Sequence, residues 1–152
     1  MLPLEEEIKD QIRLNGPIPF SRFMETALFF PKLGYYASGN RIGQNGDYYT
    51  SPVSHPLFAK LLSIQLEQMW DYMGQPSQFD VVEVGAGSGI LHDDLVRSFK
   101  SLGRSFQDSV RYIPIDRCRP LTHKPNWIQS NGIPLRNVVG CVISNELFDS
   151  FP

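Results

Sequence analysis

Apolar residues in the first half of the chain recur with a helical period. The pattern is present in residues 4–14 and 20–30, and Pro or Gly flanks both segments. Beyond Pro56, six apolar residues follow at helical spacing before Gly74: Phe58, Leu61, Leu62, Leu66, Met69 and Met73. Residues at this spacing share one face of a helix, and glycine is a common stop signal. We therefore predict two short helices and, after Pro56, a longer amphipathic helix that ends near Gly74.

The second half of the chain alternates between apolar runs of strand length and a helical pattern. We expect strands at residues 79–84, 110–115, 126–129 and 138–144. Leu91, Leu95 and Phe99 mark a helix between the first two. The first run is interrupted only by Asp80 and Glu83, as expected for a parallel strand that is covered on both faces. Strands that alternate with helices favour right-handed crossovers and an open parallel α/β sheet.

A long segment without a sustained period, residues 31–56, connects the two halves. It is rich in Gly, Asn, Ser, Pro and Tyr. Loops of this length in compact domains are usually functional or disordered. Four tyrosines favour packing over disorder: Tyr35, Tyr36, Tyr48 and Tyr49. We predict an ordered loop that folds against the rest of the chain.

Composition narrows the class of protein. The chain has 152 residues, 41% hydrophobic residues and a net charge of -2. It has no basic stripe for nucleic acid and no apolar run near the roughly 20 residues of a membrane helix. The acidic N-terminal segment is unlike a transit peptide. Cys118 and Cys141 lack C-x-x-C spacing and indicate reduced thiols, and the three histidines lack ligand spacing. We expect neither a nucleic-acid nor a membrane partner, and no metal.

A glycine-rich turn, Glu83 to Gly89, joins the first predicted strand to the following helix. Glycine allows unusual dihedral angles and lets a ligand approach the free amides of a helix start. The dinucleotide fingerprint requires a third small residue, where this chain has Ile90, and a pyrophosphate tolerates the Glu83 carboxylate poorly. The carboxylate suits a cation, and S-adenosylmethionine carries an ammonium and a sulfonium. The alternative is a plain strand-to-helix turn with a solvated Glu83.

Polar residues also follow the second and fourth predicted strands. Asp116 ends the second strand, where an acidic side chain can accept ribose hydroxyls; the alternative is a cap on the segment that follows it. Asn145, Glu146 and Asp149 follow the fourth strand and would border the same crevice. Methylation of an arginine requires carboxylates to orient the guanidinium and accept a proton, and Glu146 is the first candidate. The alternative is that Asn145 and Glu146 cap a helix with an apolar inner face.

Several ordered motifs together resemble one family, the class I S-adenosylmethionine-dependent methyltransferases that include the mitochondrial complex I assembly methyltransferase and its bacterial relatives. The resemblance runs from about Gly16 to Pro152. The motifs are Gly16-Pro17-Ile18-Pro19-Phe20 with Phe23-Met24, Gly34-Tyr35-Tyr36, Gly46 to Pro52 with Pro56-Leu57-Phe58, Glu83 to Gly89, and Ser144-Asn145-Glu146-Leu147-Phe148-Asp149.

The resemblance implies a Rossmann-like seven-stranded sheet, an N-terminal helical extension, S-adenosylmethionine as the donor and a protein arginine as the acceptor. Its implied site residues are Glu83, Gly85, Gly87 and Gly89 for the methionine end of the donor, Asp116 for the ribose, Asp47 and Thr50 in a lid loop, and Asn145 and Glu146 toward the acceptor. Val53 and Ser130 depart from the family pattern at the lid and adenine contacts.

The resemblance also predicts the organisation of the chain. Residues 1–75 would be the helical extension with the lid loop, and residues 76–152 the first half of the methyltransferase domain, in a larger protein. Its four strands would take the order 3-2-1-4, so that the fourth strand forms an edge open to self-association. Three functions remain open: a methyltransferase, a non-catalytic assembly or scaffold protein with the same fold, and a disfavoured nicotinamide oxidoreductase. We expect a cytoplasmic location, or the mitochondrial matrix for a eukaryotic relative.

Overall fold

A computed structural model describes residues 3–37, 55–118 and 125–152 of the chain. The chain divides into two units, one made of Met1–Arg41 with Glu146–Pro152 and the other of Ile42–Asn145. The first unit contains α1 (Pro3–Asn15), α2 (Phe20–Phe29) and the short 3-10 helix η1 (Phe148–Ser150). Both N-terminal helices that the sequence predicts are confirmed to within one residue at each end.

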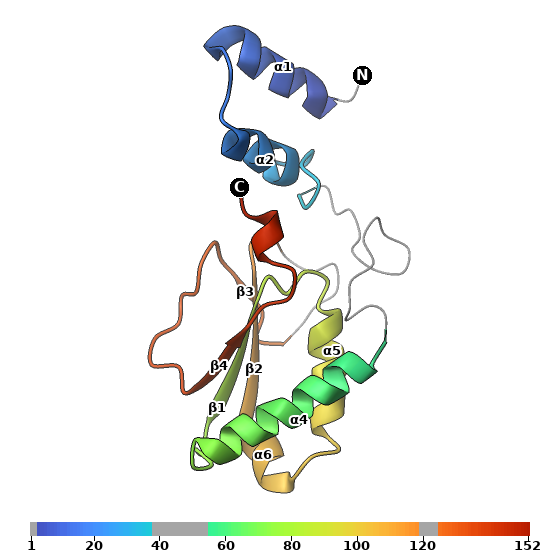
Figure 1. Cartoon of the computed structure of the whole chain (residues 1–152), viewed down its shortest axis with the longest axis vertical. Coiled ribbons are helices and arrows are strands. Elements are labelled where there is room, and N and C mark those ends of the chain that lie inside the picture. Colours follow the sequence, from blue (N-terminus) through green and yellow to red (C-terminus); the bar gives the residue numbers. More distant parts are fainter. Residues whose placement is uncertain (1–2, 38–54, 119–124) are drawn as a thin grey trace. The chain divides into compact units, whose positions relative to one another are not determined.

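The second unit is built on a parallel sheet of four strands (Figure 1). The strands are β1 (Phe79–Val84), β2 (Val110–Asp116), β3 (Ile128–Gln129) and β4 (Gly140–Ile143). Their order is β3-β2-β1-β4, and each neighbouring pair is parallel. The predicted α/β class and strand order are therefore confirmed. The third and fourth strands are shorter than predicted: Asn126 has a φ angle of 57°, which is incompatible with a strand, and the apolar Val138 and Val139 precede the first residue of β4.

Three helices pack on one face of this sheet: α4 (Leu57–Tyr72), α5 (Ile90–Phe99) and α6 (Arg104–Ser109). With β1 and β2 they enclose the main core, whose members are Ala59, Leu66, Trp70, Phe79, Val81, Leu91, Leu95, Phe99, Phe106 and Tyr112. The sequence pattern missed α6, because this helix contributes a single buried residue, Phe106, and one residue makes no period. The ring of Phe106 lies 5.6 Å from that of Trp70.

The opposite face of the sheet carries a smaller cluster of buried residues, Val82, Ile113 and Ile115. Leu135 and Val138, from the segment before β4, pack against it. β4 ends the order of strands, as predicted, and Val142 on this strand is 54% exposed. Self-association through this edge stays a prediction. No helix in the described ranges is long and apolar enough to cross a membrane.

The amino end of the sheet is fixed by a buried carboxylate. Asp80 is 3% exposed and accepts two hydrogen bonds from Arg111, at 2.8 Å from Nε and 3.0 Å from an Nη atom. Gly140 is the register partner of Asp80 across β1 and β4. A Cβ atom at Gly140 would lie 2.0 Å from the Asp80 carbonyl oxygen. The close approach of these two backbones therefore requires glycine at this position.

Candidate functional site

The glycine turn between β1 and α5 is tied to the carboxyl end of β2. The amides of Gly85 and Ala86 both donate to the Ile115 carbonyl oxygen, at 2.9 and 3.2 Å. Gly85, Gly87 and Gly89 have φ angles of 77°, 55° and 77°. This left-handed region disfavours side chains with a Cβ, which explains the repeated glycine. The turn thus presents bare backbone at the carboxyl ends of two adjacent strands, where open α/β sheets bind ligands.

Asp116 connects this turn to the segment that follows β2. One carboxylate oxygen, Oδ2, accepts the Gly87 amide at 2.9 Å, and the other, Oδ1, accepts the Cys118 amide at 2.8 Å. The predicted cap on the following segment is therefore present, and the bond to Gly87 comes in addition to it. Burial raises the pKa of Asp116, while the amides of Cys118, Gly87 and Arg117 oppose that rise. An ionised carboxylate has about four lone-pair sites, so Asp116 can also accept a ribose hydroxyl.

Glu83 lies inside the unit, beneath the turn. It is 3% exposed, and the Tyr112 hydroxyl donates to its Oε2 at 2.8 Å. The alternative of a solvated Glu83 is therefore wrong, because alternate residues of β1 face the helices and bury this side chain with them. Burial raises the pKa of Glu83 from 4.5 to about 7; the Tyr112 hydrogen bond opposes that rise, and the charge of Asp116 adds to it. At neutral pH both protonation states of Glu83 are populated.

Tyr112 is a site residue that the sequence pattern did not single out. It is 6% exposed, and its ring meets the His92 ring edge-on at a centroid distance of 5.2 Å. His92 Nδ1 lies 2.9 Å from Asp93 Oδ1. Burial and the neighbouring Glu83 raise the pKa of the Tyr112 phenol, so the phenol keeps its proton and acts as a donor. Val81 is the register partner of Tyr112, which sets this residue on the face of Glu83.

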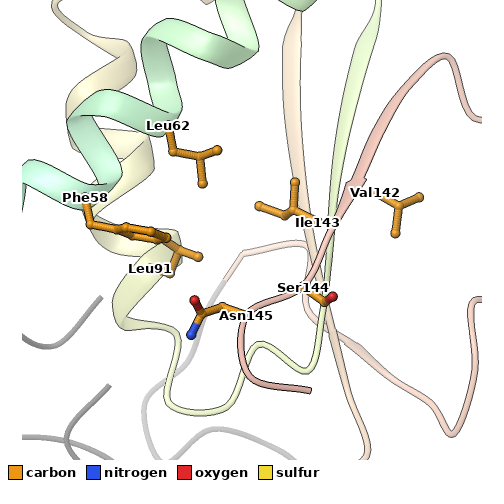
Figure 2. A pocket seen from close by; sticks show the side chains of 7 residues that line it. All are labelled: Phe58, Leu62, Leu91, Val142, Ile143, Ser144 and Asn145. Carbon is orange, nitrogen blue, oxygen red and sulfur yellow. The ribbon is translucent and has the colours of Figure 1, made fainter. Parts of the chain in front are cut away.

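A cavity of about 380 Å³, with both apolar and polar lining, opens beside the end of β4. Its lining residues come from α4, α5 and the β4 segment: Phe58, Leu62, Leu91, Val142, Ile143, Ser144 and Asn145. Figure 2 shows the Asn145 side chain on the side where Phe58 and Leu91 lie, whereas Val142 points away from them. Asn145 is thus a predicted site residue that borders a cavity, where its amide can accept or donate hydrogen bonds.

The other predicted residues are placed as follows. Asp47 and Thr50 lie outside the described residues. Glu146 belongs to the first unit and has a φ angle of 48°. The alternative that Asn145 and Glu146 cap a helix is wrong, because the cap of η1 is Leu147, and the helix buries none of its residues. In the described ranges, no group of His, Cys, Asp and Glu side chains could hold a metal ion, and Cys118 and Cys141 form no disulfide.

The sequence of this chain is similar to those of known methyltransferases. A family model described as "Putative S-adenosyl-L-methionine-dependent methyltransferase" matches residues 61–152. The chain is 38% identical over 94 residues to the mitochondrial protein arginine methyltransferase NDUFAF7 of Xenopus laevis. That alignment covers 62% of this chain and 22% of the relative, so the chain spans less than a quarter of the length of the relative.

Two solved structures from Burkholderia thailandensis are also similar. One is a likely methyl transferase bound to S-adenosyl-homocysteine; it is 31% identical, has a TM-score of 0.63, and the match covers 78% of this chain and 30% of that one. The other is an uncharacterised protein of the same superfamily, with 29% identity and a TM-score of 0.71. Its match covers 98% of this chain and 40% of that one.

Proposed function

This chain belongs to the family of S-adenosyl-L-methionine-dependent methyltransferases whose model matches residues 61–152, and we propose that the protein transfers a methyl group from this donor to an arginine side chain of a protein. The observation that carries the proposal is the arrangement of Glu83 and Asp116 on either side of the glycine turn. Both carboxylates lie at the carboxyl ends of adjacent parallel strands. Support for the acceptor comes from the Xenopus relative, which is named a protein arginine methyltransferase.

The residues around the turn fit the donor. The proposed partner of the donor's ammonium is Glu83, whose Oε2 is held by Tyr112 at 2.8 Å. The proposed partner of the ribose hydroxyls is Asp116, and the backbone of Gly85, Gly87 and Gly89 gives the donor close access to the chain. When bound, the sulfonium supplies an electrophilic methyl group. The role of the protein is to hold that methyl group in line with the acceptor nitrogen, because alignment of the reacting atoms lowers the activation barrier.

For the acceptor we propose the cavity beside β4. Phe58, Leu62 and Leu91 offer an apolar wall to the methylene groups of an arginine, and the Asn145 amide oxygen can accept a guanidinium proton. A guanidinium is always protonated in proteins, so transfer to nitrogen must be followed by proton loss. Glu146 is the proposed proton acceptor on the basis of its sequence position alone.

Three further assignments belong to the same proposal. Asp47 and Thr50 would contact the donor from a lid loop, and the domain boundary would lie near residue 75. The protein would act in the cytoplasm of a bacterium or, in a eukaryote, in the mitochondrial matrix, since the Xenopus relative is named as mitochondrial.

Calorimetry on the complete natural protein tests the donor. We expect S-adenosylmethionine to bind and NAD not to bind, and we expect methylation of an arginine-containing protein, followed by mass spectrometry. Binding of NAD in preference to S-adenosylmethionine would refute the proposal. Donor binding without transfer to arginine or any other protein nitrogen would instead favour the scaffold function.

Asp116→Asn tests the ribose contact. Asparagine has one acceptor oxygen and one amide nitrogen. The side-chain NH2 would therefore face the backbone N–H of either Gly87 or Cys118, and two hydrogen-bond donors cannot pair. Hydrogen bonds to a charged partner contribute about 1.5–3 kcal/mol, so we expect the affinity for S-adenosylhomocysteine to fall by about 10- to 100-fold. The matched control is Asp108→Asn, which removes an exposed ion pair with Arg104 and should leave the affinity unchanged. Equal affinities in the two variants would exclude Asp116 from the donor site.

A further inference from the structure

The structure assigns Tyr112 as a positioning residue of the donor site: its hydroxyl holds the Glu83 carboxylate in the orientation in which the carboxylate receives the donor's ammonium group. This inference rests on the proposed donor binding and adds to it a residue outside the glycine motif. Tyr112 lies on β2, one strand away from Glu83, and it does not belong to the turn.

The contact itself has the geometry of a strong hydrogen bond. The Tyr112 hydroxyl donates to Glu83 Oε2 at 2.8 Å, and the two side chains are 6% and 3% exposed. Bonds from a neutral donor to a carboxylate are short and stronger than neutral pairs. The bond occupies one oxygen of the carboxylate and fixes its plane. The second oxygen, Oε1, is the atom that would receive the ammonium.

The core holds Tyr112 in place, so the hydroxyl is already oriented before a ligand binds. Its ring packs edge-on against His92 at 5.2 Å and lies tilted against Phe99 at 6.4 Å, both on α5. Its backbone belongs to β2, which pairs with β1 throughout Phe79–Val84. A binding group is held to the required accuracy when its supporting side chain is itself fixed by packing. Tyr112 meets that condition.

The charges around Glu83 show why the hydroxyl affects its ionisation. Asp116 and Tyr112 face it from β2, and α5 contributes His92 with its partner Asp93 to the same network. From β4, the thiol of Cys141 lies near Tyr112. The buried residues of α4, which are Ala59, Ser63, Leu66 and Trp70, carry no titratable group.

Within this set the Tyr112 hydrogen bond opposes the effects of burial and of Asp116, which together raise the pKa of Glu83 to about 7. Loss of the hydroxyl would therefore raise that pKa further and leave more of Glu83 as the neutral acid at pH 7. A neutral acid attracts an ammonium group far less than a carboxylate does. Donor affinity should thus depend on pH, and Tyr112 should set the pH at which it changes.

Tyr112→Phe in the complete natural protein tests this role, since it removes the hydroxyl and keeps the ring. We measure the affinity for S-adenosylhomocysteine by calorimetry between pH 5.5 and 8.5. The wild-type affinity should rise with a midpoint near pH 7. The variant midpoint should move upward by about one pH unit, because one unit is a tenfold change in the proton equilibrium. Protonation alone would then lower the affinity about fivefold at pH 7 and less than twofold at pH 8.5, and the lost orientation should add a further decrease of the same size at both pH values.

Phe99→Leu is the control for general loosening of the core, because Phe99 packs against the Tyr112 ring and has no group that can hydrogen-bond the carboxylate. This variant should keep the wild-type midpoint. In Tyr112→Phe, an affinity and a midpoint that both equal those of wild type, or a loss of the same size in Phe99→Leu, would overturn the inference and leave the proposed donor site intact. Absence of binding by the wild type at every pH would refute the donor site as well.

A second substitution serves if Tyr112→Phe does not fold. Incorporation of 3-fluorotyrosine at position 112 keeps the ring and the hydroxyl but makes the phenol a stronger hydrogen-bond donor. The stronger bond favours the ionised carboxylate, so the midpoint should move to lower pH. An unchanged midpoint would contradict the positioning role.

Discussion

Replacement of Glu83 by glutamine is expected to stabilise the fold at pH 8 and to remove most of the donor affinity. The folded-state pKa of Glu83 is about 7, above its ordinary value of 4.5. Between these values the folded state binds the extra proton, so wild-type stability decreases as pH rises from about 4.5 to 7. At 1.36 kcal/mol per pH unit, the loss is on the order of 3 kcal/mol. Glutamine does not ionise, and its oxygen can still accept the Tyr112 hydroxyl.

Urea unfolding at pH 5 and pH 8 measures this effect. The variant and the wild type should have similar free energies of unfolding at pH 5, and the variant should be more stable by about 1–3 kcal/mol at pH 8. Its affinity for S-adenosylhomocysteine at pH 8 should fall by about 10- to 100-fold, because a charge-assisted hydrogen bond is lost. Glu67→Gln is the control for the affinity, since Glu67 accepts the Gly103 amide on the surface and lies outside the proposed donor site.

Lower stability of Glu83→Gln at both pH values would show that the wild-type carboxylate stabilises the fold, and would contradict this account. The expected result has a functional meaning. A buried carboxylate that destabilises the folded state at neutral pH is typical of a binding or catalytic site, where strongly shifted pKa values concentrate. Glu83 would then be a residue that lowers the stability of the folded protein and that the protein needs for donor binding.

Gly140→Ala is expected to destabilise the second unit by about 3 kcal/mol or more. Repacking of side chains cannot relieve the clash, so the loss of stability should exceed that of ordinary overpacking in a core. The new Cβ would lie 2.0 Å from the carbonyl oxygen of Asp80 and 2.6 Å from its nitrogen. The φ angle of 150° at this position also disfavours a side chain. Because both neighbours are backbone atoms, β4 must move away from β1 to make room.

Urea unfolding followed by circular dichroism measures this loss. Gly132→Ala provides the matched control, because a Cβ at Gly132 would have no atom within 4 Å. The control should lie within about 0.5 kcal/mol of wild type. Similar stability of the two variants would show that the pairing of β4 with β1 tolerates a side chain at position 140.

Local sequence pattern was sufficient for most of the elements. The apolar run at Phe79–Val84 and the helical spacing that ends at Phe99 depend only on near neighbours in the chain, and both elements are present as predicted. The same holds for the glycine turn, whose residues have the left-handed φ angles that glycine favours. The pattern failed for α6, and it overextended β4, since pairing rather than hydrophobicity ends a strand.

The site, like the fold, was predictable from the sequence only in part. The types and order of residues, an acid before the glycine turn and an acid at the end of β2, are properties of the sequence, and they indicated a cationic ligand with a ribose. The sequence could not predict that Glu83 is buried under Tyr112 or that Asp116 binds the Gly87 amide. Both contacts join residues 29 positions apart. They depend on the parallel register of β1 and β2, which only the folded sheet determines, and that register shifts the pKa of Glu83 to about 7.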